Sequence, residues 1–377
     1  MFSFARHSKS KISNWWWTVD KVSFSLAVFL IFIGAMLVLS ASPSAAHRDR
    51  LADDFAFIKK QGVFIFMGLV LMIGVSMQSL RTIRRLAVFG FLCAFAGVVL
   101  TYVVGDATKG AARWIKFAGF SLQPSEFIKP VFIVVTAWLL DANKRIEDFP
   151  GMTLALGPFL LTALSVFGQP DLGMTVLISG VWALQMVWAG IPVWLIMTLF
   201  SAGLVLVTGS YFFLAHVRDR IDRFLASENE IGSQIQKSMD AFANGNLLGR
   251  GPGEGYVKMT LPDVHTDFIF ALAGEECGVW LTTIIVAAFA AIVVRSMTLS
   301  MRDNNLFVMY AASGLAASLG GQAIVNMCSA LQLMPAKGMT LPFVSYGGSS
   351  MLASCLAMGM LLAITRKNAA AEDKDNG

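Results

Sequence analysis

Long apolar runs separated by short polar stretches make up most of the chain. A helix needs about 20 apolar residues to cross a hydrocarbon core roughly 30 Å thick, and it satisfies its backbone hydrogen bonds within one segment. The runs predict ten such helices, at about 23–42, 62–79, 86–105, 126–140, 151–168, 172–189, 191–212, 267–294, 305–330 and 344–365. We therefore expect an all-α integral membrane protein in which one loop, about 213–266, is large.

Composition supports this class. Hydrophobic residues make up 56% of the 377 residues and charged residues 14%, with a mean hydropathy of +0.66, a balance that excludes an ordinary soluble domain. The first run is too long for a signal peptide and lacks a small-residue cleavage pattern before "HRD". We interpret it as a retained anchor.

Basic residues predict the orientation of the chain. They gather before the first span, in the short loop at Arg81–Arg85, and after the last span at Arg366 and Lys367. The positive-inside rule puts all three clusters in the cytoplasm. We expect a cytoplasmic segment at 1–22, a ten-helix membrane domain at 23–366 and a disordered cytoplasmic tail at 367–377.

The cysteines and the net charge of +5 indicate neither a disulfide or metal site nor a nucleic-acid site. The four cysteines are dispersed through apolar segments, with no paired spacing, which indicates small buried side chains. The basic residues cluster at helix ends without a nucleic-acid motif. Membrane lipids with anionic headgroups are therefore the expected counterpart, and no nucleic acid is expected.

The large loop is expected to be structured. Its apolar residues are spaced as in two amphipathic helices lying against a membrane surface, at Val217–Leu225 and Ile231–Met239. The glycine-rich and proline-containing stretch "LLGRGPGEGYVKMTLP" follows. Long structured loops held near a bilayer are more often functional than plain connectors.

A first polar constellation lies at residues 110–129. Arg113 and Lys116 precede the fourth span, where Pro124 and Glu126 suit the first turn of a helix. A capped helix with snorkelling cations explains this pattern without function. Lys129 favours a functional interpretation, because it lies one turn from Glu126 and the pair can neutralise itself beside a water-filled cavity.

The second constellation is "LPDVHTDFIFALAGEE", which contains His265. Thr266 and Asp267 are expected to cap the eighth span. Glu275 is expected about 12 Å further along the helix, well inside hydrocarbon, and Glu276 on nearly the opposite side from Asp267. At least one of these glutamates should face a polar cavity, pair with a cation or be protonated.

The third constellation is "LMPAKGMTLPFVSYGGSS", which contains Lys337 and Ser345. Pro342 and the Gly347–Gly348 pair should break the start of the last span. The small residues suit close helix packing, and a break can also free backbone groups to line a cavity. At 168–173 we interpret Asp171 mainly as a helix cap.

All three constellations fall on the outer side of the ten-span arrangement. A cavity there, lined by carboxylates, lysines and arginine and flanked by lipid, suits a substrate with an anionic head and a membrane-bound tail.

These motifs together resemble the SEDS family of bacterial cell-wall polymerases, and its division branch more than its elongation branch. The resemblance rests on "RWI", "QPSEFIK", "GRGPGEG", "LPDVHTDFIFALAGEE" and "KGMTLPFVSYGGSS", in this order from the first span to the last. It departs from the family in the outer loop, where "SQIQKS" stands in place of the family's Tyr-Gln and Gln-Ser pairs.

The resemblance implies peptidoglycan glycosyltransfer, in which lipid II units are joined into glycan strands outside the cytoplasmic membrane at the septum. It makes Asp267 the essential carboxylate, which can take the proton of the attacking sugar hydroxyl. The substrate-binding candidates, including those for the lipid diphosphate, are Arg113, Lys116, Glu126, Lys129, His265 and Lys337. A divalent cation such as Mg²⁺ or Mn²⁺ is implied by the family, with no metal ligand identified, and Glu275, Glu276 and Ser345 are possible cavity-lining residues.

The family also implies a class B penicillin-binding protein as partner, together with division regulators.

Two other functions compete with polymerisation. A transporter that flips lipid II would need functional polar residues on both faces, and a non-catalytic scaffold of the division machinery would need only its packing positions.

Overall fold

The computed structural model describes residues 11–50, 52–104, 106–108, 111–117, 120–169, 171–213, 218, 219, 222, 234–334 and 338–367. Its helices are α1 (Lys11–Thr18), α2 (Lys21–Arg48), α3 (Ala56–Ser76), α4 (Leu80–Val104), α5 (Pro124–Arg145), α6 (Gly151–Leu154), α7 (Leu156–Gly168), α8 (Leu172–Trp188), α9 (Val193–Phe213), α11 (Gln234–Gly245), α12 (Ile269–Met301), α13 (Leu306–Ala330) and α14 (Gly348–Ile364). Most of the first predicted amphipathic helix of the loop, Lys337 and the tail beyond 367 lie outside the described residues.

Each of the ten predicted spans falls on a helix, with α6 and α7 together forming the fifth. Among the described residues, six helical segments are long and apolar enough to cross a membrane: α2, α3, α4, α6–α7, α12 and α13. The predicted helix start at Pro124 is confirmed, because α5 begins there with Glu126 in its first turn. The ten-span count stays a prediction.

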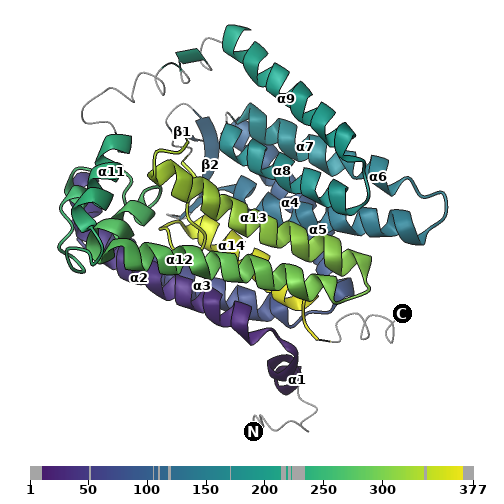
Figure 1. The fold of residues 1–377 in the computed structure, drawn as a ribbon, viewed down its shortest axis with the longest axis horizontal. Coiled ribbons are helices and arrows are strands. Elements are labelled where there is room, and N and C mark those ends of the chain that lie inside the picture. The colour runs from purple at the N-terminus through teal and green to yellow at the C-terminus, as the bar shows by residue number, and fades with distance from the viewer. Residues whose placement is uncertain are drawn as a thin grey trace.

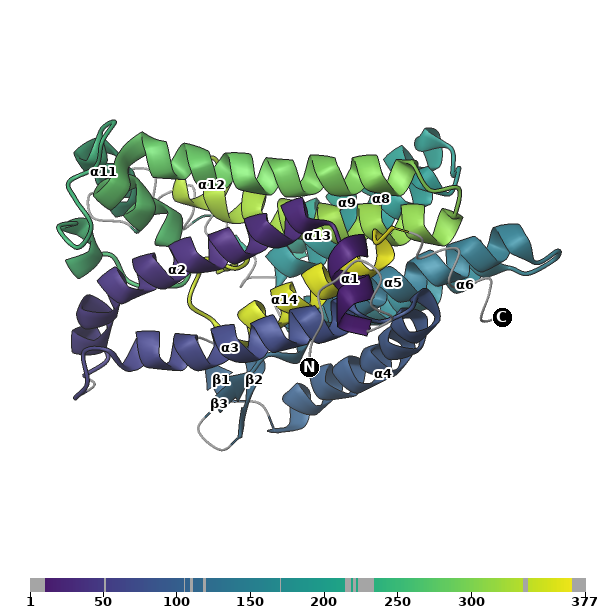
Figure 2. The same cartoon turned by 90° about the horizontal axis from the view of Figure 1, so that it is seen from below.

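The inner helices are α5, α13 and α14. Almost every residue of α14 is buried, and this helix packs against α3, α5 and α13. Helices α2, α4, α8 and α12 surround this centre, while α9 lies along one side with its apolar residues exposed (Figures 1 and 2). Apolar exposure of this kind on an outer helix is what contact with lipid requires.

A small sheet was not predicted. Strands β1 (Asp106–Thr108), β2 (Ala111–Phe117) and β3 (Phe120–Leu122) form an antiparallel sheet in the order β1-β2-β3. It lies between α4 and α5, where the sequence analysis expected no regular structure, so the all-α expectation omits this element. The stretch "AARWIKF" lacks the strict alternation of a half-buried strand, because Trp114 and Ile115 are adjacent apolar residues.

Two ionic clusters connect α2 and α12 at opposite ends, one with an exposed arginine and one fully buried. At one end Arg295 contacts Asp20 at 2.7 Å, next to the first turn of α2. At the other end Lys258 Nζ contacts Glu276 Oε1 at 2.8 Å, and Ser40 on α2 also donates to Glu276. Twenty residues separate Asp20 from Ser40, and nineteen separate Glu276 from Arg295.

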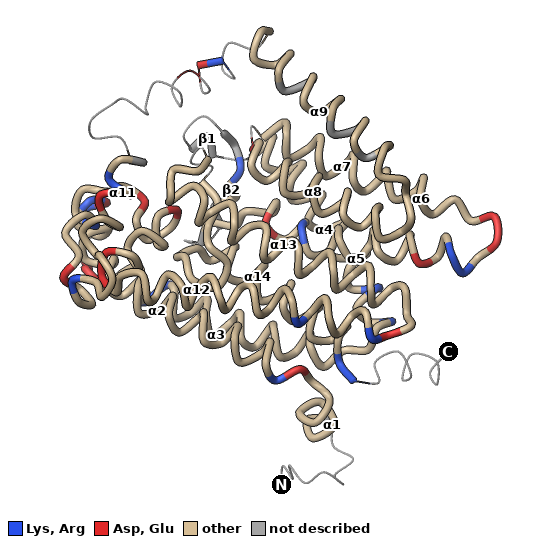
Figure 3. The backbone as a smooth tube through the Cα atoms, viewed as in Figure 1, with Lys and Arg blue, Asp and Glu red and all other residues tan. Residues whose placement is uncertain are grey.

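This separation corresponds to the thickness of a membrane. At 1.5 Å per residue the clusters lie about 30 Å apart along the helices, which is roughly one hydrocarbon thickness. Charged groups are least costly at the two edges of that core. Charged positions also gather toward the two ends of the bundle in Figure 3. We therefore locate the boundaries of the hydrocarbon near Asp20–Arg295 and near Ser40–Glu276.

Helix α12 is kinked near the second of these boundaries. Gly278 has a non-helical backbone, with φ 70° and ψ −165°, so the helical hydrogen bonds are interrupted there. The loop after α11 replaces them: Arg250 N donates to Glu275 O at 3.0 Å, Gly251 N to Glu276 O at 2.9 Å, and Val279 N to Asn246 O at 3.2 Å. The loop is thereby fastened to α12 through its backbone.

Candidate functional site

Asp267 lies in a turn just before α12. The turn begins at Asp263, which has φ +53°, and the backbone N–H groups of Thr266 and Asp267 donate to the Asp263 carbonyl at 3.1 and 3.0 Å. Helix α12 starts only at Ile269, after Phe268, with no side-chain cap. The prediction that Thr266 and Asp267 cap this helix was therefore wrong. The Thr266 hydroxyl donates back to the Asp263 carbonyl instead.

The turn is fixed from α13 by Asn326. The amide nitrogen of Asn326 donates to the Asp267 carbonyl at 2.9 Å and to the Met339 carbonyl at 2.7 Å. Because Asn326 is 1% exposed, neither bond competes freely with water. A single side chain thus joins the turn of Asp267 to the segment that leads into α14.

Gly338 faces the carboxylate of Asp267. A Cβ atom at position 338 would lie 3.6 Å from Asp267 Oδ2, and Gly338 has φ +64°. A side chain there would be strained and would stand against the carboxylate. The segment that contains predicted site residues 337–345 therefore does approach Asp267, although Lys337 itself is not described.

Ser345 and His265 join the same two segments. The Ser345 hydroxyl donates to the Thr266 carbonyl and accepts from Leu341 N at 2.9 Å. The His265 carbonyl accepts from Tyr346 N at 2.8 Å. Ser345 therefore acts in these contacts as a structural residue that holds the turn against the loop.

The imidazole of His265 packs between Phe57 and Tyr346, at 4.6 and 5.4 Å between ring centroids. Burial lowers the pKa of His265, although the Asp263 carboxylate opposes this shift. Its Nδ1 atom has no hydrogen-bond partner among the described residues. Burial therefore disfavours the cationic form of His265, and its predicted contact with the substrate stays a prediction.

Glu126 and Lys129 form the second part of the site. Lys129 Nζ contacts Glu126 Oε2 at 2.9 Å and Gln322 Oε1 at 2.6 Å. The Gln322 amide nitrogen donates to the Thr340 carbonyl at 2.9 Å. The expected Glu126–Lys129 pair is present, buried and linked to the segment before α14.

Gln322 and Asn326 are the site residues that the sequence analysis missed. They lie four residues apart on α13, hence on one face of the helix, and bind the consecutive carbonyls of Thr340 and Met339. Through them the Glu126–Lys129 pair and the Asp267 turn share one polar network. The available signal was two amides spaced by four residues inside the apolar run "GQAIVNM".

Arg113 binds the start of α8 (Leu172–Trp188). It contacts Asp171 Oδ2 at 3.1 Å and donates to the Gln169 carbonyl at 2.8 Å. Asp171 also accepts from Met174 N at 3.1 Å, so its predicted role as the cap of α8 is confirmed. Lys116 is paired with Ser121 across β2 and β3, and its side chain is not described.

Glu275 and Glu276 bind the outer loop and do not line an open cavity. Glu275 is fully buried and accepts from the backbone of Tyr256 and Val257 at 2.9 and 3.0 Å, at the start of the 3₁₀ turn η1 (Val257–Met259). Glu276 pairs with Lys258 at 2.8 Å. The prediction that one glutamate pairs with a cation is confirmed.

The depth of these glutamates in the membrane stays a prediction, on which the length of α12 bears. Helix α12 has 33 residues, so it is about 50 Å long and exceeds a core of roughly 30 Å. Its first turns rise above the outer cluster, and Glu276 lies at the boundary of the hydrocarbon. Asp267 is then about 10 Å or more beyond that boundary, at the level of lipid headgroups and of sugars attached to them.

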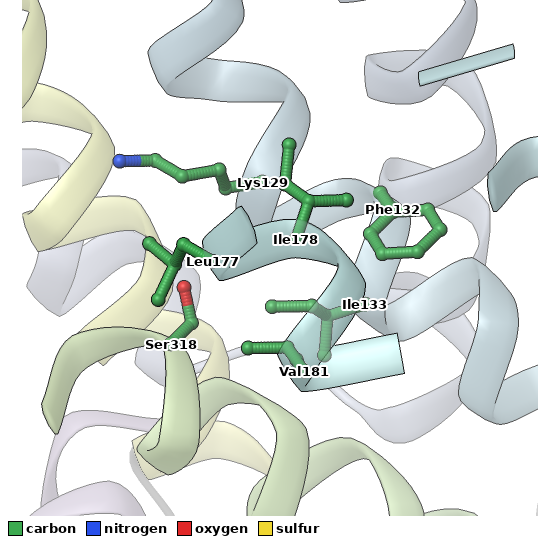
Figure 4. Close-up of a pocket in the computed structure, with 7 residues that line it drawn as sticks. All are labelled: Lys129, Phe132, Ile133, Leu177, Ile178, Val181 and Ser318. Atoms are coloured by element: carbon green, nitrogen blue, oxygen red, sulfur yellow. The ribbon is translucent and has the colours of Figure 1, made fainter. Parts of the chain in front are cut away.

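A narrow pocket lies below Lys129, between α5, α8 and α13. Figure 4 shows its lining, in which the amine of Lys129 points away from Phe132, Ile133 and Val181. Leu177, Ile178 and Ser318 complete it. The space is too small for a water molecule, so the hydrocarbon part of Lys129 lies in a dry, packed environment.

The described residues contain no group of three or more His, Cys, Asp or Glu side chains that could hold a metal ion. Asp267 and Asp263 stand in the same turn, below that number of metal-ligating side chains. Mg²⁺ commonly takes one or two protein carboxylates together with phosphate oxygens of the substrate. That donor set would need a phosphate-bearing substrate beside Asp267.

Comparison with known proteins places this geometry in context. Residues 20–370 match the profile of the FtsW, RodA and SpoVE family, described as cell cycle proteins. A Caulobacter vibrioides protein named "Probable peptidoglycan glycosyltransferase FtsW" is 40% identical over 97% of this chain and 94% of its own length. A Geobacter metallireducens protein of the same name is 36% identical over 92% of this chain and 95% of its own.

Solved structures agree with the fold. A chain from a peptidoglycan synthase complex, described as coordinating polymerization and crosslinking, has a TM-score of 0.78, 25% identity and coverage of 92% of this chain and 97% of that chain. The rod shape determining protein RodA of Thermus thermophilus has a TM-score of 0.66 at 23% identity over 93% of this chain and 97% of its own. The predicted helical membrane fold is confirmed.

Proposed function

This chain belongs to the FtsW, RodA and SpoVE family of cell cycle proteins, and from that premise we propose that it is an FtsW-type peptidoglycan glycosyltransferase that polymerises lipid II during septal wall synthesis. The main support in the structure is Asp267, whose turn is held by Asn326 and faced by Gly338. We propose that the carboxylate lies on the outer side, about 10 Å beyond the boundary of the hydrocarbon. A sugar linked through a diphosphate to a membrane lipid would present its reacting carbon at that level.

In the proposed reaction the Asp267 carboxylate accepts the proton of the acceptor's sugar hydroxyl. The hydroxyl oxygen forms a bond to the anomeric carbon of the donor. The bond from that carbon to the lipid diphosphate breaks, and the diphosphate leaves with the electron pair. Because this leaving group is already acidic, it requires charge neutralisation more than a second carboxylic acid, unlike the leaving group of a glycosidase.

The cations differ in what they can offer a diphosphate. Lys129 already contacts Glu126 and Gln322, and Arg113 already contacts Asp171. A diphosphate would have to share these cations with a buried carboxylate. Lys116 and Lys337 complete the proposed set, and a divalent cation held by Asp267 and the diphosphate would supply further neutralisation when bound.

Membership of this family also suggests where the protein acts and with which partner. The chain is a multi-pass membrane protein, and we propose that it acts at the septum with both termini in the cytoplasm. The bond from Lys367 N to Thr18 O, at 3.1 Å, supports a common side for the two terminal segments, and the basic residues beside the first and last spans favour the cytoplasm. A class B penicillin-binding protein is the proposed partner, in line with the synthase complex that resembles this chain. Division regulators would act on the same complex.

The test is polymerisation by the purified complex. The chain and its penicillin-binding partner, reconstituted with lipid II and a divalent cation, should yield glycan polymer, and the partner alone should yield none. Absence of polymer from the reconstituted complex of the chain and its partner would contradict the proposal. Movement of labelled lipid II across the vesicle membrane without polymer would favour a transporter. If neither polymer nor lipid movement is observed, a scaffold is favoured.

Asn326 should position Asp267 in this reaction. In Asn326→Asp a carboxylate of nearly the same shape cannot donate to the Asp267 and Met339 carbonyls and is placed against both of them. We expect kcat to fall about tenfold or more, with KM for lipid II changed much less, because a small displacement of a catalytic group is costly. Steady-state polymerisation measures both constants.

Ser313→Ala is the matched control for Asn326→Asp. Ser313 is buried on the same helix, but its hydroxyl donates only to carbonyls of that helix, at 2.7 and 3.2 Å. Asn326→Asp should melt below Ser313→Ala, because its buried carboxylate faces two carbonyls, so both constants are measured at a temperature at which both variants are folded. A wild-type kcat for Asn326→Asp would show that the Asn326 bonds do not position the acid.

A further inference from the structure

The tip of the outer loop exposes large apolar side chains. Leu247 and Leu248 follow directly after α11 and are 69% and 78% exposed. Tyr256 and Met259, at η1, are each 66% exposed. Glycine, asparagine and arginine surround the two leucines in the sequence "NGNLLGRG", so the exposure is confined to a short apolar tip in an otherwise polar turn.

This tip is fastened beside the membrane-facing surface of α12. Val279 N donates to the Asn246 carbonyl at 3.2 Å, and a Cβ atom at Gly278 would stand 2.4 Å from the Leu247 carbonyl oxygen. The next residues of α12, Val279 and Trp280, are 50% and 66% exposed. The apolar surface therefore continues from α12 onto the loop.

The level of the tip follows from the two ionic clusters. Glu276, two residues before Gly278, is held by Lys258 and Ser40 at the outer boundary of the hydrocarbon. Leu247 lies against Gly278, and hence at this same boundary. A loop that rose into water from this position would place two leucines in solvent at a cost of roughly 1.5–3 kcal/mol for each side chain.

We propose that Leu247 and Leu248 insert among the acyl chains of outer-leaflet phospholipids, so that the segment from α11 to η1 is a membrane contact and not a free outer loop. Arg250, exposed and three residues past Leu247, then lies at the level of lipid phosphates. The leucines occupy the lipid side of the boundary, and Arg250 the headgroup side.

This contact would be mechanically coupled to Asp267. The backbone of Arg250 and Gly251 binds the carbonyls of Glu275 and Glu276, and these residues belong to the short rigid part of α12 that begins at Ile269, two residues after Asp267. Lipid contact at Leu247 and Leu248 thus helps to fix the height of the Asp267 turn above the membrane.

The test compares single cysteines in a variant whose four native cysteines are replaced by alanine. Leu248→Cys probes the tip, and Glu254→Cys is the control, because Glu254 is exposed in the same loop. The purified chain alone is reconstituted in phosphatidylethanolamine and phosphatidylglycerol vesicles and treated with a membrane-impermeant maleimide. We expect Leu248→Cys to react at least tenfold more slowly than Glu254→Cys, and equally fast after denaturation.

A fluorophore on each cysteine gives a second measurement that protection by protein would not reproduce. Phospholipids carrying a nitroxide on the acyl chain should quench the label at position 248 strongly and that at 254 weakly. Equal maleimide rates together with equal quenching would overturn the proposal. Protection that arises only when the penicillin-binding partner is added would also overturn it and would assign the tip to a protein interface. Neither measurement requires lipid II, so the outcome is independent of the proposed activity.

Discussion

Replacing Asp267 with asparagine should lower the polymerisation rate by at least about a hundredfold, because general base catalysis commonly contributes factors of 10² to 10⁴. The amide has nearly the shape of the carboxylate. The hydrogen bonds of Asp267 to Asp263 and Asn326 use its backbone, so the substitution leaves them in place. The turn should survive while the proton acceptor is lost. The rate of glycan formation from lipid II, measured with the partner present, tests this.

Asp263→Asn is the matched control. It makes the same chemical change in the same turn, where the Asp263 carbonyl accepts the turn hydrogen bonds. Asparagine tolerates the φ of +53° at this position. We expect Asp263→Asn to retain most of the activity. An equal loss in both variants would mean that the integrity of the turn, or the local negative charge, matters more than a base at Asp267.

The sequence predicted the helices well because their signal is local. Each span is a continuous apolar run, and the break before α14 follows from Pro342 and the two glycines, with the helix starting at Gly348. The meeting of Glu126, Asp267 and Ser345 near one another was also predicted, since all three precede or begin spans on the same side. The residues that support each of these predictions lie within about 20 residues of one another in the sequence.

Contacts between distant segments could not be predicted in the same way. Glu275 and Glu276 looked like charges in hydrocarbon, because their partners in the loop lie about 18 residues before them. Gln322 and Asn326 looked like polar interruptions of a packing helix, because the carbonyls that they bind belong to an irregular segment. The wrong cap at Thr266 has the same origin: tertiary contacts of the turn displaced a local preference.

The close backbone contact between the loop and α12 should make Gly278→Ala strongly destabilising. Gly278 has φ 70° and ψ −165°, a region that residues with a Cβ atom rarely adopt, at a cost of about 1–3 kcal/mol. The new methyl group would also stand 2.4 Å from the Leu247 carbonyl oxygen and 2.5 Å from Gly249 N. Since both neighbours are backbone atoms, relief requires moving the loop. We expect a loss of about 3 kcal/mol or more.

Thermal unfolding of the purified variants measures this effect, with Gly62→Ala as the control. Gly62 lies in α3, and nothing stands within 4 Å of a Cβ atom there, so its melting temperature should stay equal or rise slightly, because alanine favours the helix. In Gly278→Ala the loop must separate from α12. The carbonyls of Glu275 and Glu276 would then lose their hydrogen bonds, and the ion pair between Glu276 and Lys258 would be weakened. Equal melting temperatures for the two variants would contradict this account. They would mean that the kink can straighten without cost, and that the loop does not hold the short helix below Asp267.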